Sequence, residues 1–224
     1  MSRVYLYALL SGTPACETGV GVCSERLRVV ALGDLVAVVG DVGELPAPTA
    51  LTLRAQDAVL RRLCAAVDAV LPVRFGTLVA DDAALAESLA PRRPELARAL
   101  GRISGCEQMT VRVWGEAPAA APPPVAVEGG PGTRYLAGRR RAREWIHRVP
   151  ELEPARRGLA DLVREERVER HDRPPLLATV QHLVPRGAVG RYLDAIDGAR
   201  AGLRPWRVSV TGPWPAYAFV DEAA

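Results

Sequence analysis

The spacing of apolar residues changes repeatedly between that of a strand and that of a helix, and this change of period is what most constrains the fold. Residues 4–10 are apolar on both faces, which is typical of a central strand. Residues 27–32 and 35–39 predict two further strands, joined at hairpin distance by Gly33-Asp34. The first part of the chain therefore begins with sheet structure.

Helices are predicted to follow these strands. Thr49 has the side chain of a helix N-cap. The helix after it has one apolar face, formed by residues at i, i+3, i+4 and i+7: Leu60, Leu63, Cys64 and Val67. Cys64 is therefore predicted to be a buried thiol, and Pro72 to end the helical stretch. Residues 81–103 predict two short helices divided by prolines, and the alternation over 109–114 predicts a strand.

The second half of the sequence repeats this mixture. Residues 133–172 are strongly charged and are predicted to be helical, with breaks at prolines. Residues 176–184 predict a strand, and 189–196 carry the apolar face of a helix. Residues 206–211 alternate as another strand, and 217–220 predict a short last strand.

Each half thus has a strand, a helix and a strand in succession. We predict an α+β fold of two ferredoxin-like mixed α/β units, with an added helical segment in the second. Residues 116–132 are rich in Ala, Pro and Gly and predict a linker. The predicted domains are therefore an N-terminal α+β domain at 1–115 and a C-terminal α+β domain with long charged helices at 133–224.

Positive charge is concentrated in one segment. All 29 basic residues are arginine, against 26 acidic residues. Residues 134–173 hold twelve arginines and eight acidic residues, a net charge of +4. Many of these acids lie three or four positions from an arginine, which is typical of an ion-paired helix surface. The triplet 139–141 beside Tyr135 and Trp145 leaves two other interpretations open, an acidic protein partner and nucleic acid.

No pattern of catalytic or metal-ligating residues stands out. His147, His171 and His182 lie far apart and have no partner at ligand spacing, and His182 is predicted to be a core or edge histidine of a strand. Residues 19–24 begin like a dinucleotide fingerprint but lack its third glycine, so they predict a turn. The four cysteines form no C-x-x-C pair. We therefore predict no cofactor, no metal and no enzymatic activity.

The compartment follows from the apolar runs. None approaches the roughly 18 residues that a membrane span needs. The run at residues 4–10 is at the short limit of a signal-peptide core, and no Ala-x-Ala cleavage site follows it. We expect a cytoplasmic protein with no membrane partner.

Two segments of the chain are unusual enough to indicate a family. The first consists of Leu71, Pro72, Val73, Arg74, Phe75, Gly76 and Thr77. The second consists of Thr211, Gly212, Pro213, Trp214 and Pro215, followed by Tyr217. Prolines and glycines are predicted to make both segments rigid corners. In their order and distance they resemble the signature segments of the gas vesicle protein L/F family, and the resemblance spans nearly the whole chain.

This resemblance implies a gas vesicle accessory protein that binds the small, very hydrophobic main shell subunit during nucleation or growth of the vesicle. Other gas vesicle accessory proteins are further expected partners. The two signature segments would frame the contact, and Arg139 and Arg140 in the arginine-rich segment would add electrostatic steering. Such a subunit exposes apolar surface before assembly, so a protein that covers this surface would prevent aggregation.

Three alternatives stay open at this point. Trp214 and Tyr217 could complete the core of the second unit instead of meeting a partner. The chain could be a small-molecule enzyme of ferredoxin-like architecture, which a buried pocket with convergent titratable groups would favour. It could also be a nucleic-acid-binding module, which binding that falls steeply with salt would favour.

Overall fold

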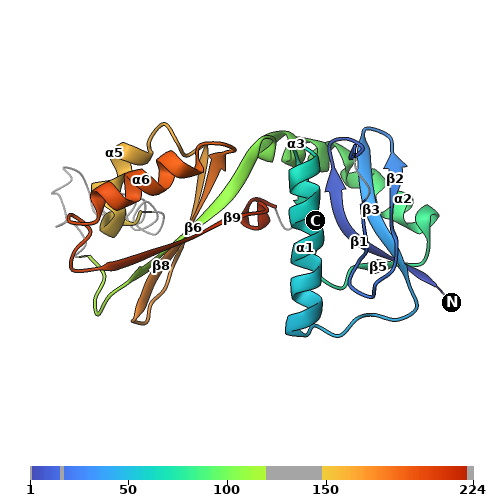
Figure 1. Cartoon of the computed structure of the whole chain (residues 1–224), viewed down its shortest axis with the longest axis horizontal. Helices are drawn as coiled ribbons and strands as arrows, with labels where there is room; N and C mark the ends of the chain where they lie inside the picture. The colour runs from blue at the N-terminus through green and yellow to red at the C-terminus, as the bar shows by residue number, and fades with distance from the viewer. Residues whose placement is uncertain (1, 16–17, 120–147, 221–224) are drawn as a thin grey trace, which may run out of the picture. The chain divides into compact units, whose positions relative to one another are not determined.

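The chain forms two compact units (Figure 1). The computed structural model describes residues 2–15, 18–119 and 148–220. The first unit contains residues 1–108 and also the end of the chain from Trp214 onward, and the second contains residues 109–213. These bounds differ from the predicted domains 1–115 and 133–224 in two ways. The second unit begins within the strand that we placed at the end of the first, and the last residues of the chain join the first unit.

The sheet of the first unit is built around its first strand. The strands are β1 (Arg3–Leu10), β2 (Leu27–Leu32), β3 (Leu35–Val42), β4 (Val70–Pro72) and β5 (Leu78–Val79). Their order is β2-β3-β1-β4, and β5 pairs with β1 as well. β1 pairs antiparallel with β3, β4 and β5, and seven of its eight residues are buried. The prediction of a central strand is confirmed, because a strand without a polar face must be covered on both sides.

The helices of the first unit follow the predicted pattern closely. They are α1 (Ala50–Ala66), α2 (Asp82–Leu89), the 3-10 turn η1 (Ala90–Arg92) and α3 (Arg93–Ile103). Thr49 caps α1, since its side chain accepts from the Thr52 amide while the Thr52 hydroxyl accepts from the Thr49 amide. Two details of the prediction are wrong. α1 ends at Ala66, well before Pro72, and Cys64 is half-buried because it lies at the margin of the core.

One part of the core of the first unit lies between α1 and the sheet. Tyr5 and Tyr7 of β1 share one cluster of buried residues with three residues of α1, which are Val59, Leu60 and Leu63. The two tyrosine rings lie 4.7 Å apart between centroids. Burying a leucine side chain of this kind stabilises a fold by about 1.5–3 kcal/mol, so the apolar face of α1 is what holds this helix on the sheet.

Residues 19–24 form the turn that the sequence predicts. The Ser24 amide donates to the Gly21 carbonyl at 3.2 Å. The Glu25 carboxylate accepts from the Tyr7 hydroxyl and from the Cys23 amide, the latter at 2.8 Å. A Cβ at Gly40 would lie 2.6 Å from the same carboxylate, so a larger residue there would displace the Glu25 side chain. The turn is therefore anchored to β1 by a partly buried acid.

The described residues of the second unit form a four-stranded sheet and two helices. Its elements are β6 (Cys106–Trp114), the 3-10 turn η2 (Pro150–Leu152), α5 (Glu153–Leu159), β7 (Glu165–Arg170), β8 (Leu176–Pro185), α6 (Val189–Ala199) and β9 (Arg207–Trp214). The strand order is β7-β8-β6-β9. The core contains buried residues of β6, β8, α5 and α6. This arrangement is compatible with the ferredoxin-like unit that we predicted, and the α+β class is confirmed.

The prediction of long charged helices over residues 133–172 is wrong where the structure describes these residues. α5 has seven residues, and residues 165–170 form strand β7, paired antiparallel with β8 from Glu165 opposite Leu183 to Arg170 opposite Ala178. Val168 lies opposite Val180, so pairing with an apolar strand overrides the helical preference of the charged residues. Charges suit this strand because it lies at the edge of the sheet.

Candidate functional site

The first signature segment, residues 71–77, leaves the sheet and turns back at once. Its first two residues belong to β4. The Thr77 amide then donates to the Arg74 carbonyl at 3.3 Å, and Gly76 between them has a φ of +86°. A residue with a Cβ would be strained in that conformation, so glycine is required. The predicted bend at Gly76 is confirmed.

A buried chain of hydrogen bonds ties this turn to helix α1. The Gly76 amide donates to the Tyr5 hydroxyl at 2.9 Å, and that hydroxyl donates to Gln56 Oε1 at 2.5 Å. Gln56 Nε2 in turn donates to the Val73 carbonyl at 3.2 Å. Burial raises the pKa of Tyr5, which keeps the hydroxyl protonated as a donor. The sequence did not lead us to predict a role for Gln56. The one feature that could have indicated it is that Gln56 is a polar residue on the apolar face of a helix.

The seven residues of this segment differ in how far their side chains are exposed to a partner. The first three are buried in the unit, and Phe75 packs edge-on against Tyr5 with 6.1 Å between ring centroids. Phe75, Gly76 and Thr77 are half-buried, whereas Arg74 is exposed. Arg74 is therefore the residue of this segment best placed to contact another molecule, while its neighbours hold the backbone in place.

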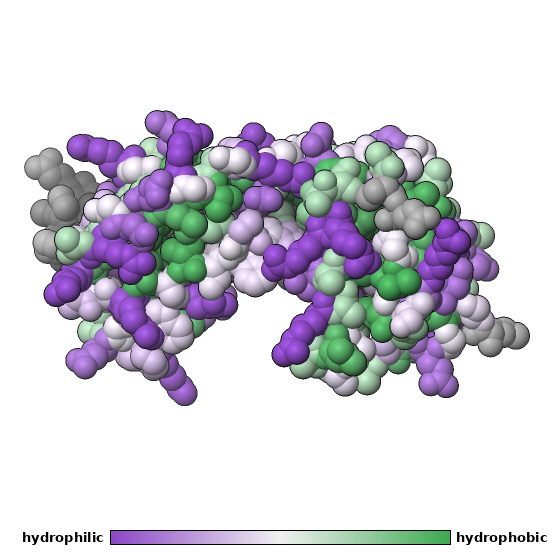
Figure 2. All heavy atoms as spheres, viewed as in Figure 1, coloured by the Kyte–Doolittle hydropathy of each residue, from purple (hydrophilic) through white to green (hydrophobic). Residues whose placement is uncertain are grey.

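Exposed leucines lie close to the turn and at the start of α1. Leu45 is 54% exposed, and its Cδ1 lies 3.3 Å from the position that a Cβ on Gly76 would take. Leu51 and Leu53, in the first turns of α1, are 76% and 47% exposed. Figure 2 shows apolar surface in green over this end of the helix. These residues are apolar surface that the described part of the unit does not bury.

The second signature segment continues a strand before the chain turns. Thr211 to Trp214 form the end of β9, so the predicted corner is wrong for these residues. Gly212 has a φ of +134°, a conformation that favours glycine. The boundary between the two compact units falls between Pro213 and Trp214. The segment therefore carries the chain from the second unit back into the first.

The residues after this segment form a 3-10 turn, η3 (Tyr217–Phe219), and not the predicted strand. The Phe219 amide donates to the Ala216 carbonyl at 3.0 Å, which closes the turn. Gln108 accepts from the Ala218 amide at 2.8 Å, and Phe219 is fully buried. These residues complete the first unit, so the alternative that placed them in the core of the second is wrong.

Trp214 and Tyr217 both lie against the exposed side of α1. The Arg61 guanidinium lies over the Trp214 ring at 4.5 Å from the centroid. The Tyr217 hydroxyl donates to Asp57 at 3.0 Å, and Asp57 also pairs with Arg61 at 2.7 Å. Burial, together with the nearby Asp57 carboxylate, raises the pKa of Tyr217. Asp57 and Arg61 were not predicted to be site residues. Their i, i+4 spacing indicates an ion pair on a helix surface, and it does not indicate that Arg61 packs against a tryptophan.

The two signature segments thus meet the same helix. Gln56 holds the first and the adjacent residue Asp57 holds the second, although about 140 residues separate the segments along the chain. Both the turn at residues 73–77 and the end of the chain from Trp214 onward belong to the first unit. Arg139 and Arg140, the other predicted contact residues, lie outside the described residues.

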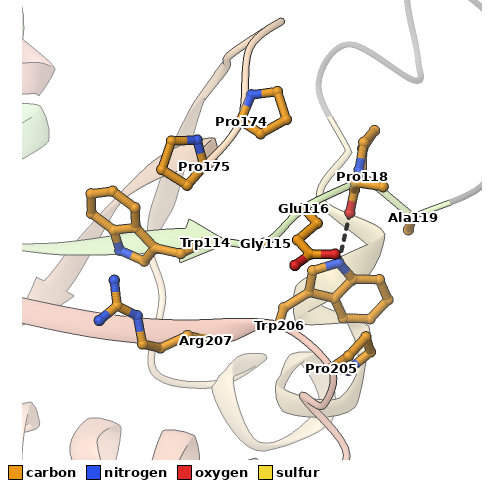
Figure 3. A pocket seen from close by; sticks show the side chains of 11 residues that line it. Trp114, Gly115, Glu116, Pro118, Ala119, Pro174, Pro175, Pro205, Trp206 and Arg207 are labelled. Atoms are coloured by element: carbon orange, nitrogen blue, oxygen red, sulfur yellow. Dashed lines mark hydrogen bonds between the residues drawn. The ribbon is translucent and has the colours of Figure 1, made fainter.

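The second unit has an open groove that sequence reasoning did not predict (Figure 3). Its volume is about 1050 Å³, and its walls include Trp114, Trp206 and four prolines. The Trp206 indole N–H donates to the Ala117 carbonyl at 3.1 Å, and Arg207 lies over the Trp114 ring at 5.3 Å from the centroid. Aromatic and proline side chains make this groove mainly a surface for apolar contacts.

A smaller pocket of about 280 Å³ is lined by several titratable groups, among them Glu166 and His182. Such convergence is what would favour the enzyme alternative. His182, however, is 2% exposed, and both ring nitrogens have a hydrogen-bond partner: Nε2 lies 2.9 Å from the Glu166 carboxylate and Nδ1 lies 2.7 Å from the Tyr192 hydroxyl. Tyr192 is itself fully buried. This arrangement joins β7, β8 and α6, and the prediction of a satisfied core histidine is confirmed.

The hydrogen bond from His182 holds the pKa of Glu166 below its usual value. A carboxyl with a depressed folded pKa adds stability above its unfolded pKa of about 4.3, and that contribution is lost as the pH falls through the folded value. We therefore expect Glu166→Gln to destabilise the protein at pH 7, with the difference from wild type shrinking below about pH 4. Urea denaturation at pH 7 and pH 3 checks this, and an equal difference at both would contradict it.

The described residues contain no group of three or more His, Cys, Asp or Glu side chains that could hold a metal ion. Of the cysteines in that part of the chain, Cys23 is exposed, Cys64 is half-buried and Cys106 is buried. No helix among the described residues is long and apolar enough to span a membrane.

Comparison with known proteins agrees with the resemblance seen in the sequence. A family model described as gas vesicle synthesis protein GvpL/GvpF matches residues 3–221. Gas vesicle protein L of Streptomyces sp. (strain CB03234) is 30% identical over 233 residues, which cover 91% of this chain and 86% of the relative.

Two crystal structures share the fold. GvpF from Anabaena sp. PCC7120 matches with a TM-score of 0.75 at 14% identity, covering 99% of this chain and 97% of that one. GvpF from Microcystis aeruginosa matches with a TM-score of 0.74 at 13% identity, covering 98% and 99%. With a family match over nearly its whole length, this chain belongs to the GvpL/GvpF family of gas vesicle proteins.

Proposed function

We propose that this chain binds the hydrophobic main shell subunit of the gas vesicle and thereby assists vesicle nucleation and assembly. Family membership supports a gas vesicle accessory role. The observation that carries the finer proposal is the convergence of both signature segments on helix α1, through Gln56 for one and Asp57 with Arg61 for the other. The two segments are far apart in sequence, but both are held on helix α1. A contact surface that is preorganised for binding needs its parts to be fixed in this way.

The chemistry around α1 suits an apolar partner. Leu45 and Leu51 are exposed large apolar residues, and Tyr217 is 41% exposed although it is aromatic. Rigid aromatic side chains lose little conformational entropy on binding and are frequent at the energetic centres of interfaces. Arg74 adds an exposed cation next to this surface. The steering role of Arg139 and Arg140 remains part of the proposal.

Co-purification of this chain with the main shell subunit tests the proposal. We expect Trp214→Ala and Arg74→Ala each to weaken binding roughly tenfold or more, because truncating a central anchor costs 1–3 kcal/mol or above. Trp214→Ala removes the ring that Arg61 covers, while Arg74 is exposed and its loss leaves the fold intact.

Two matched variants make the test specific. Trp206→Ala removes an indole from the groove of the second unit, and Arg98→Ala removes an exposed arginine from α3, so both should bind as wild type does. Circular dichroism of each variant checks that it is folded. Undiminished binding by both Trp214→Ala and Arg74→Ala would sink the assignment of the site, and loss of binding in Trp206→Ala alone would move the site to the groove.

A further inference from the structure

The backbone on both sides of Arg74 is held by hydrogen bonds. Before it, the Val73 amide donates to the Tyr7 carbonyl at 3.1 Å, and the Val73 carbonyl accepts from Gln56 at 3.2 Å. After it, the Arg74 carbonyl accepts from the amide of Thr77 at 3.3 Å and from the hydroxyl of the same residue at 2.8 Å. The Cα of Arg74 is therefore fixed relative to both β1 and α1.

Gln56 and Tyr5 hold this turn from inside the core, and both side chains are buried. The Gln56 amide group reaches one end of the turn directly, at Val73, and the other end through the Tyr5 hydroxyl, which accepts from Gly76. A leucine in place of Gln56 would bury more apolar surface and would need no hydrogen bonds. The glutamine therefore serves the placement of the turn more than the stability of the core.

The side chain that this framework presents has no partner of its own. Arg74 is exposed, and its guanidinium makes no hydrogen bond or ion pair within the parts of the chain that the structure describes. Arg28 of the same unit, in contrast, pairs with both Asp41 and Asp82. A planar guanidinium matches the two oxygens of a carboxylate, so Arg74 is an open binding group for an acid.

Apolar side chains lie beside Arg74. Phe75 is half-buried against Tyr5, and Leu45, which is 54% exposed, lies next to Gly76. A single exposed ion pair contributes little to binding, so Arg74 alone would hold a free anion only weakly. The surroundings therefore favour an acid on a macromolecule whose apolar surface covers Leu45 and Phe75 at the same time.

We propose that the turn at residues 73–77 presents Arg74 to a carboxylate of the main shell subunit, and that Gln56 and Tyr5 position it. This inference rests on the proposed function. It adds the chemical group that this part of the site takes, an aspartate or glutamate flanked by apolar residues. Because the backbone of the turn is already ordered, the entropy lost on binding here is confined to the Arg74 side chain.

Double-mutant cycles with the shell subunit test for the carboxylate. The acidic residues of the subunit are replaced one at a time by their amides, and the affinity of each variant for this chain is measured. Arg74→Ala should weaken binding of the unchanged subunit about tenfold, but should have no further effect on one amide variant, which already lacks the pair. Arg74→Lys should restore only part of the affinity, because an ammonium group cannot bind both oxygens in one plane. An equal loss with every amide variant would overturn the assignment of a carboxylate.

Tyr5→Phe and Gln56→Met test the positioning roles. Each should speed hydrogen exchange of the Gly76 amide and weaken binding of the shell subunit roughly three- to tenfold, because the turn must then be ordered on binding. Neither change should weaken binding further when it is combined with Arg74→Ala, since both act through that residue. Combined with Trp214→Ala, their effects on affinity should add.

Tyr7→Phe is the matched control, because it removes the same hydroxyl two residues further along the same strand. The Tyr7 hydroxyl accepts from the Val22 amide at 2.8 Å, in the turn at residues 19–24. Its loss should speed exchange of the Val22 amide and leave both the Gly76 amide and the affinity for the shell subunit unchanged.

The outcomes separate this inference from the function on which it rests. Faster exchange at Gly76 with unchanged affinity, in both Tyr5→Phe and Gln56→Met, would overturn the positioning roles. An equal loss of affinity in Tyr7→Phe would overturn them too, since it would trace the effect to the core as a whole. Failure of the wild-type chain to bind the shell subunit contradicts the proposed function, whereas wild-type binding that these variants leave unchanged contradicts this inference alone.

Discussion

Replacing Leu60 with alanine lowers the free energy of unfolding of the first unit by about 2–5 kcal/mol, the range measured for buried leucines. Leu60 is fully buried between α1 and the sheet, in the cluster that contains Tyr5 and Tyr7. Its loss leaves a cavity that the central strand β1, buried along nearly its whole length, is poorly placed to fill. Urea denaturation followed by circular dichroism, with hydrogen exchange of the α1 amides, measures this effect.

Leu51→Ala is the matched control, since it makes the same chemical change in the same helix. Leu51 is 76% exposed, so its replacement should change the free energy of unfolding by less than about 0.5 kcal/mol. Equal losses in the two variants would mean that α1 does not bury the face described above. If Leu51→Ala leaves the free energy of unfolding unchanged, as expected, and also weakens binding of the shell subunit, the start of α1 belongs to the proposed contact.

Arg170→Met should be the most damaging change in the second unit, at about 3–5 kcal/mol. The Glu151 carboxylate is fully buried, and it accepts from the Arg170 guanidinium at 3.0 and 3.2 Å and from the Ala119 amide at 3.0 Å. Removing the arginine leaves a buried negative charge without its cation, which costs far more than the loss of an exposed ion pair.

Neutralising the acid should reverse most of this loss. Glu151→Gln combined with Arg170→Met keeps an acceptor for the Ala119 amide and removes the unpaired charge, so the double variant should be more stable than Arg170→Met. Arg156→Met, which breaks the exposed i, i+3 pair with Glu153, should cost less than about 1 kcal/mol. A double variant no more stable than Arg170→Met would show that packing of the arginine, and not its charge, is what matters.

Local patterns of residue type were enough to predict much of this protein. The apolar run of β1, the Thr49 cap, the bend at Gly76 and the strand of His182 all follow from spacing and backbone preferences that act over a few residues. The two signature segments were also sufficient to indicate the family, because their unusual Pro, Gly and aromatic residues occur in order over nearly the whole chain.

Tertiary structure decided the rest, since the decisive interactions join residues far apart in the sequence. Residues 165–170 have the charge spacing of a helix but become a strand, because pairing with β8 satisfies their backbone and packs the partly buried Val168 against the core. The end of the chain was expected in the second unit. Instead, Tyr217 donates a hydrogen bond to Asp57 of the first unit, and the Trp214 ring packs against Arg61 of the same unit. Nothing within a few positions of Gln56, Asp57 or Arg61 indicates these partners, so only the folded chain brings the two signature segments to one helix.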